Sequence, residues 1–148
     1  MEIILDTNIL IEILKNNKQT IKEVEEYDIH YISVITAMEL FYGAFNKIEL
    51  QKLKKFIELF NIIPIDESIS SIAKELVYKY AKSHSLDIPD SLIASTALKI
   101  NLPLLTYNKK DFKFIDNLIL CNIPSVWQMH AGIAFLFNTI HNLLDTLL

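Results

Sequence analysis

The chain has 148 residues, about the length of one domain, and 51% of them are hydrophobic while 22% are charged. This composition is typical of a folded protein and excludes a disordered one. The formal net charge is −4, and every one of the 14 basic residues is a lysine. Nucleic-acid binding by bulk positive charge is therefore excluded, as is any arginine contact to phosphate or guanine. Because Cys121 is the single cysteine, an intrachain disulfide and a cysteine-based zinc site are excluded too.

Neither end of the sequence predicts a membrane protein. The first residues, MEIILDTN, carry an acid at position 2 and no cationic segment, unlike a signal peptide. The most apolar long stretch, 126–148, is interrupted by polar residues at 128, 130, 138, 141, 142 and 145, which is too polar for a transmembrane helix. We therefore expect a cytoplasmic protein with no membrane partner.

Short apolar runs alternate with helical patterns along the chain. A strand-like run at 2–5 precedes two helical patterns, at 7–15 and 18–27, and a second run at 31–34 precedes helical patterns at 36–45 and 48–60. A third run at 62–65 precedes helical patterns at about 66–83 and 87–100. Two more strand-like runs follow, at 102–106 and 118–121. This alternation predicts an α/β fold with a central, mainly parallel sheet of about five strands between two layers of helices. Asn101, before the fourth strand, is expected in a left-handed turn.

Acidic residues follow the ends of several predicted strands, where ligands bind in parallel sheets. Asp6 directly follows the first strand, although it could simply cap the next helix. Glu39 has apolar neighbours on both sides, although it could form a capping box with Thr36. Asp90 lies in the first turn of its helix, where the helix dipole alone favours an acid. The run TYNKKD at 106–111 follows the fourth strand and could be an ordinary turn.

Taken together, these acids predict a cation site. Carboxylates brought to one edge of a sheet repel each other by about 3 kcal/mol per pair at about 5 Å and an effective dielectric near 20. A divalent cation removes this repulsion, and ligands that are all oxygen atoms suit Mg²⁺ or Mn²⁺.

Four segments, in this order, resemble one known family. They are IILDTNILI at 3–11, SVITAMELFYGA at 33–44, DSLIASTALKINLPLLTYNKKDF at 90–112, and the short strand LILC that follows. The sequence resembles a PIN-domain ribonuclease of the VapC type, the toxin of toxin–antitoxin pairs. The resemblance implies a PIN domain over residues 1–124 and a metal-dependent endoribonuclease activity.

The resemblance also implies a set of site residues. By position, Asp6, Glu39 and Asp90 match the acidic triad that would bind Mg²⁺ or Mn²⁺. The fourth acidic position is open between two residues: we expect Asp111 to be an outer or water-mediated ligand, and Asn108 to be a polar orienting group. Thr7 and Thr106 would hydrogen-bond the carboxylates or bound water.

The implied reaction is metal-assisted hydrolysis of RNA that leaves 5′-phosphate and 3′-hydroxyl ends. Lysines near the site in sequence could guide the RNA backbone: Lys99, Lys109, Lys110 and Lys113. The implied protein partners are a VapB-type antitoxin and a second copy of the chain in a homodimer. Two alternatives stay open, a PIN-type nuclease in RNA processing and an inactive RNA- or protein-binding module.

The segment 125–148 extends past the usual end of the family. From 133 onward, apolar residues recur at helical spacing, at 133, 136, 137, 140, 143, 144, 147 and 148, which predicts an amphipathic helix. We expect this helix to pack on its own domain or on a partner.

Overall fold

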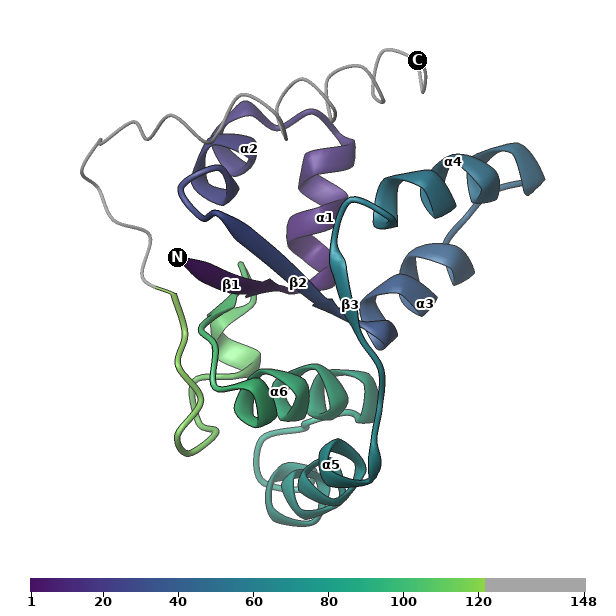
Figure 1. Cartoon of the computed structure of the whole chain (residues 1–148). Coiled ribbons are helices and arrows are strands. Elements are labelled where there is room, and N and C mark those ends of the chain that lie inside the picture. Colours follow the sequence, from purple (N-terminus) through teal and green to yellow (C-terminus); the bar gives the residue numbers. More distant parts are fainter. Residues whose placement is uncertain (122–148) are drawn as a thin grey trace.

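The computed structural model of the protein describes residues 1–121, which form a parallel sheet with helices on both faces (Figure 1). In chain order the elements are β1 (Glu2–Leu5), α1 (Thr7–Leu14), α2 (Lys18–Val24), β2 (Ile29–Ser33), α3 (Val34–Tyr42), α4 (Lys47–Ile57), β3 (Asn61–Ile63), α5 (Glu67–Tyr80), α6 (Ile88–Ile100), β4 (Leu104–Leu105) and the short 3₁₀ helix η1 (Lys109–Asp111). The predicted segment 125–148 and the domain boundary at 124 lie outside the described residues.

The sheet has four strands in the order β3-β2-β1-β4, and all neighbouring pairs are parallel. Ile4 is the register partner of Tyr31 on one side and of Leu104 on the other. The fifth predicted strand is reduced to one parallel bridge, in which Leu120 pairs with Leu104. Because the strand order reverses between β1 and β4, the carboxyl ends of these two strands form a switch point, where ligands bind in such sheets.

The apolar core lies in two layers, one on each face of the sheet. On β1, Ile3 and Leu5 belong to one buried cluster, while Ile4 between them belongs to the other, as the alternation of side chains along a strand requires. Figure 1 shows α1 and α2 on one face and α5 and α6 on the other. The predicted three-layer architecture is therefore confirmed. Within the part of the chain that the structure describes, no helix is long and apolar enough to cross a membrane.

Two local predictions can be compared with the structure directly. Asn101 has a φ of 53° and ψ of 44° at the end of α6, so the expected left-handed residue is present. Helix α3 begins at Val34, with Ser33 as its N-cap, and not at 36. The capping-box interpretation of Thr36 and Glu39 is therefore wrong, because Thr36 already lies inside the helix.

Candidate functional site

Asp6 lies between the end of β1 and the start of α1, and its carboxylate is 4% exposed. Its Oδ1 accepts a hydrogen bond from the Thr7 N–H at 2.7 Å, so it does cap the helix. Its Oδ2 accepts from Asn8 Nδ2 at 2.8 Å and from Thr106 Oγ1 at 2.7 Å. Burial raises the pKa of Asp6, and these hydrogen bonds, which favour the ionised form, oppose the rise. The cap and the candidate ligand are thus the same residue.

Asn8 and Thr106 connect the two strands of the switch point. Asn8 Nδ2 also donates to Thr106 Oγ1 at 3.1 Å, and the Asp6 N–H donates to the Leu105 carbonyl at 3.0 Å. Thr106 therefore takes the predicted place beside a carboxylate. Asn8, like Thr106, donates one hydrogen bond to Asp6, but it was not among the predicted site residues. Its position two residues after Asp6 could have predicted the contact, because an asparagine there is within reach of the same carboxylate.

Glu39 reaches the same region from α3. Thr7 Oγ1 donates a hydrogen bond to Glu39 Oε2, and the Thr7 hydroxyl also lies 3.2 Å from the Thr36 hydroxyl. Burial raises the pKa of Glu39, the bond from Thr7 lowers it, and the charges of Asp6 and Asp87 raise it further. Thr7 therefore links α1 to the Glu39 carboxylate.

Asp90 carries the most perturbed carboxyl of the site. It lies in the first turn of α6, and its N–H donates to the Oδ1 of the N-cap residue Asp87 at 2.8 Å. Burial raises the pKa of Asp90 to about 7, with further contributions from the charges of Asp87, Asp6, Glu39 and Asp111. All of the charges that shift it are acidic, so the structure brings the predicted acids within electrostatic range of one another.

Asp87 is an acid of this region that the sequence analysis did not select. It was visible only as the start of a helix, yet its charge raises the pKa of both Asp90 and Glu39. The spacing of Asp87 and Asp90 could have predicted this effect, because two acids three residues apart at the start of a helix lie close together.

The fourth predicted position lies in the loop after β4. The charge of Asp111 raises the pKa of both Asp6 and Asp90, so this loop adds negative charge that acts on both carboxyls. The Asn108 N–H donates to Thr106 Oγ1 at 2.9 Å, but the Asn108 side chain makes no capping bond to η1. The Asn108 backbone therefore supports Thr106, while the orienting role of its side chain stays a prediction.

The donor set fits a hard cation in its chemistry. Among residues 1–121, no three His, Cys, Asp or Glu side chains are arranged so that they alone could hold a metal ion. The carboxylates are nevertheless close enough to raise one another's pKa values, and their oxygens are the ligands that Mg²⁺ and Mn²⁺ prefer. Such ions keep several waters, which complete the coordination between carboxylates that do not meet at one point.

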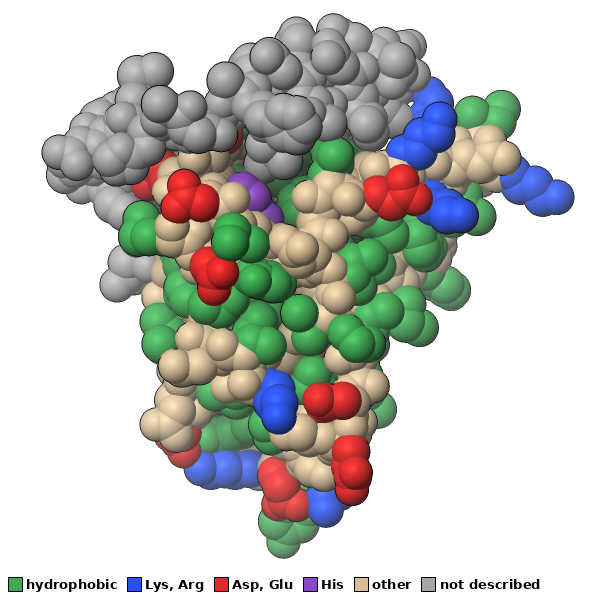
Figure 2. Space-filling view, viewed as in Figure 1, with side chains coloured by type: hydrophobic (Ala, Val, Ile, Leu, Met, Phe, Trp, Pro, Cys, Tyr) green, Lys and Arg blue, Asp and Glu red, His purple; other side chains and the backbone are tan. Residues whose placement is uncertain are grey.

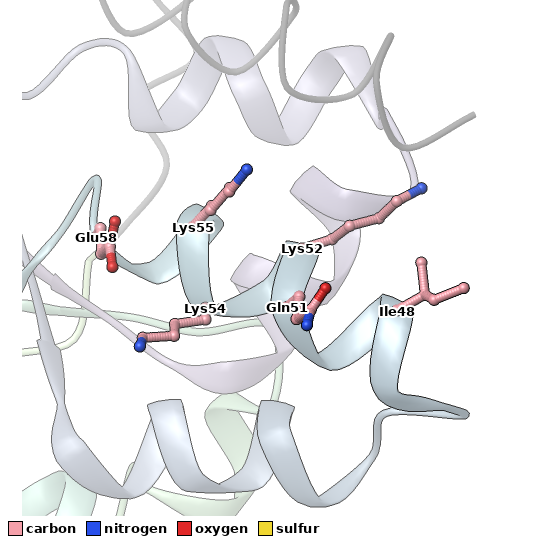
Figure 3. A pocket seen from close by; sticks show the side chains of 6 residues that line it. All are labelled: Ile48, Gln51, Lys52, Lys54, Lys55 and Glu58. Carbon is pink, nitrogen blue, oxygen red and sulfur yellow. The ribbon is translucent and has the colours of Figure 1, made fainter.

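A separate hollow of about 430 Å³ lies on α4, lined by Ile48, Gln51, Lys52, Lys54, Lys55 and Glu58 (Figure 3). It shares no residue with the carboxylate site. Three of its six lining residues are lysines, whereas the carboxylate site is acidic.

Comparison with known families identifies this arrangement. The family model described as PIN domain matches residues 3–118. The chain belongs to the PIN-domain family. This PIN domain is 38% identical over 114 residues to Ribonuclease VapC1 of Methanocaldococcus jannaschii, covering 76% of this chain and 79% of the relative. It is 35% identical over 132 residues to Ribonuclease VapC of Rickettsia bellii, covering 84% of this chain and 98% of the relative.

Solved structures show the same PIN fold. VapBC2 from Rickettsia felis, bound to a DNA fragment from its promoter, matches with a TM-score of 0.71 and 30% identity, covering 86% of this chain and 100% of that chain. VapBC-1 from nontypeable Haemophilus influenzae matches with a TM-score of 0.70 and 28% identity, covering 82% and 98%. The resemblance to VapC-type PIN domains that the sequence motifs indicated is therefore confirmed.

Proposed function

We propose that this protein is a divalent-metal-dependent endoribonuclease that acts as the toxin of a toxin–antitoxin pair. The observation that carries the proposal is the group of mutually perturbed carboxylates at the switch point, in a PIN domain whose relatives are named VapC ribonucleases. Clustered acids with raised pKa values are typical of sites that bind a cation or transfer a proton.

In this proposal Asp6, Glu39 and Asp90 hold Mg²⁺ or Mn²⁺, and Asp111 takes part through water. A cation held by these residues would supply positive charge for the scissile phosphate and a bound water of lowered pKa for the hydrolysis. Thr7 and Thr106 keep the Glu39 and Asp6 carboxylates oriented through the hydrogen bonds described above.

Proton transfer is assigned to Glu39 or Asp90. Both carboxylates belong to the set that would hold the cation, so each would lie within reach of a water bound to it, as removal of a proton from the attacking water requires. Hydrolysis of this kind leaves 5′-phosphate and 3′-hydroxyl ends, because the RNA 2′-hydroxyl takes no part.

The proposed substrate is RNA, and contacts to its backbone must come from lysine. Lys99 lies in the last turn of α6, Lys109 and Lys110 lie in η1 beside Asp111, and Lys113 follows. With few cationic contacts and a net charge of −4, affinity for RNA should be modest and should fall with added salt.

The proposed protein partners are a VapB-type antitoxin and a second copy of the chain. Large apolar side chains are exposed on α3, in the loop after it and at the start of α4: Met38, Tyr42, Phe45 and Ile48 are 57%, 95%, 91% and 68% exposed. Figure 2 shows hydrophobic side chains at the surface on this side of the molecule. A group of this kind is typical of a protein–protein interface.

The decisive experiment is cleavage of total cellular RNA by purified wild-type protein and Asp6→Asn, each with Mg²⁺, Mn²⁺ or EDTA. Asparagine is itself a good N-cap, so the variant should fold, which circular dichroism checks. Asp116→Asn is the matched control, because Asp116 is exposed and paired with Lys79 on the surface. We expect discrete cleavage by the wild type and the control alone, abolished by EDTA, with 5′-phosphate ends on mapping. Absence of cleavage with either metal would refute the nuclease.

Expression in cells separates a toxin from a processing nuclease. Growth arrest by the wild type but not by Asp90→Asn supports the toxin, and cleavage without arrest favours RNA processing. Arrest that persists in Asp90→Asn would show that hydrolysis is not its cause, as for an inactive binding module.

A further inference from the structure

The loop between β4 and η1 carries part of the candidate site, and Tyr107 lies in its middle. On one side of it, Thr106 Oγ1 donates to Asp6 Oδ2 at 2.7 Å. On the other side, the Asn108 N–H donates to Thr106 Oγ1 at 2.9 Å. Strand β4 has only two residues, so sheet pairing alone fixes little of this loop.

The Tyr107 hydroxyl connects the loop to α2. It donates to Glu23 Oε2 at 2.9 Å and lies 2.8 Å from Thr20 Oγ1. Because the single phenolic proton goes to Glu23, the Thr20 hydroxyl is the donor in the second contact. Glu23 Oε1 accepts from Gln19 Nε2 at 2.9 Å. Thr20 is 0% exposed and Glu23 9%, so these partners are fixed within the fold.

The backbone of Tyr107 is tied to the site at its other end. Its N–H donates to Asn8 Oδ1 at 3.2 Å. The Nδ2 of the same Asn8 donates to Asp6 Oδ2 and to Thr106 Oγ1. A continuous series of hydrogen bonds therefore runs from buried residues of α2, through Tyr107, to the Asp6 carboxylate.

We propose that Tyr107 is a positioning residue of the site: its hydroxyl anchors the loop after β4 to α2 and thereby holds Thr106 and Asn8 against Asp6. Packing does not account for this tyrosine, because the residue is 39% exposed while its hydroxyl is bound to a buried acid. The role of Tyr107 in the reaction rests on the proposed nuclease function, but its role in holding the loop does not.

Hydrogen–deuterium exchange of the metal-free protein tests the anchoring directly. The Tyr107 and Asn108 amides donate to side chains within the site, so a loosened loop exposes them. We expect Tyr107→Phe to raise exchange of the peptide spanning 106–112 by about fivefold, as a local opening does. The control Tyr78→Phe, at a position 89% exposed on α5, should leave that peptide unchanged. Equal exchange in wild type and Tyr107→Phe would overturn the proposal whether or not the protein cleaves RNA.

Kinetics test the consequence for the reaction. We expect Tyr107→Phe to lower kcat about tenfold with little change in KM for RNA, because the misplaced groups act at the site and not in RNA binding. Glu23→Gln keeps an acceptor for the tyrosine and should retain most activity, whereas Glu23→Leu should behave like Tyr107→Phe. The double variant Tyr107→Phe/Glu23→Leu should be no slower than the slower single variant, since both remove one interaction.

The outcomes separate the two proposals. A wild type that cleaves no RNA refutes the nuclease, and the exchange result still decides whether Tyr107 anchors the loop. A nuclease whose kcat is unchanged in Tyr107→Phe refutes the positioning role, even if exchange increases. Equal losses in Glu23→Gln and Glu23→Leu would also contradict it, because the hydrogen bond from Tyr107 would then not be the cause.

Discussion

Replacing Asp90 by asparagine should stabilise the metal-free protein at pH 8 while destroying its activity. The Asp90 carboxyl is partly buried and faces the charges of Asp87, Asp6, Glu39 and Asp111, which together with burial raise its pKa from 3.8 to about 7. In the unfolded chain the same group ionises near its ordinary value. The folded state therefore holds a proton on Asp90 that the unfolded state releases between about pH 4 and 7.

The sign of the effect follows from this difference. Where the folded protein binds the extra proton, the free energy of unfolding falls as the pH rises, and the loss is complete above the folded pKa. A rise in pKa from 3.8 to about 7 corresponds to about 4 kcal/mol at about 1.4 kcal/mol per pKa unit. Because the Asp90 carboxylate is partly open to solvent, screening reduces the expected effect to about 1–2 kcal/mol.

Urea unfolding in EDTA at pH 5 and pH 8, followed by circular dichroism, measures this effect. The stability of Asp90→Asn relative to the wild type should be greater at pH 8 than at pH 5. The comparison cancels the titration of the groups that both proteins share. Asp116→Asn is the matched control: Lys79 holds the pKa of Asp116 below its ordinary value, so Asp116 is ionised in the folded and unfolded states at both pH values. Its replacement should therefore leave the stability difference from the wild type unchanged between pH 5 and pH 8. Adding Mn²⁺ at pH 8 should stabilise the wild type more than Asp90→Asn. A stability difference that does not change with pH would refute the reasoning.

Two further predictions concern the fold. Phe112→Ala should lower the free energy of unfolding by about 3–5 kcal/mol, because Phe112 is 1% exposed and packs in the cluster under α5 and α6. Urea unfolding measures this loss, and a loss below about 1 kcal/mol would contradict the prediction. Asn101→Ala should cost about 1–2 kcal/mol, since Asn101 has a φ of 53°, whereas Asn101→Gly should retain stability. Equal stabilities of the two Asn101 variants in the same assay would show that the left-handed backbone is not strained by alanine.

Much of the fold could be predicted from hydrophobic periodicity. The β1 residues 3–5 are apolar and fully buried, and the helical spacing between strands gave the layers. The predicted fifth strand, 118–121, is longer than the single bridge observed. An apolar run shows that a segment can join a sheet, but it does not show which strand it would pair with. Leu120 is left at the edge beside a two-residue strand, so little backbone is available to pair with it.

The sequence pointed to the acids of the candidate site but not to most of the groups that contact them. Asp6 directly follows β1 and Glu39 lies in the helix after β2, whereas Asp90 lies at the start of α6, which follows another helix. Asn8 and Thr106 are 98 residues apart in the sequence. Tyr107 and Thr20 are 87 residues apart. Their partners depend on how β4 and α2 lie against β1, which no local pattern encodes.

Capping α1 and binding a cation are not exclusive roles for Asp6, and the reason is electrostatic. Asp6 and Asp87 are N-caps, and Asp90 lies in the first turn of α6, so three of the clustered acids lie at helix N-termini. The N–H groups and the positive end of the helix dipole stabilise a carboxylate there, which offsets part of the repulsion among the acids. Burial and like charge still leave the pKa of Asp90 near 7. The helix N-termini therefore lower the repulsion among the acids without neutralising their charge. The negative charge that remains would attract a divalent cation.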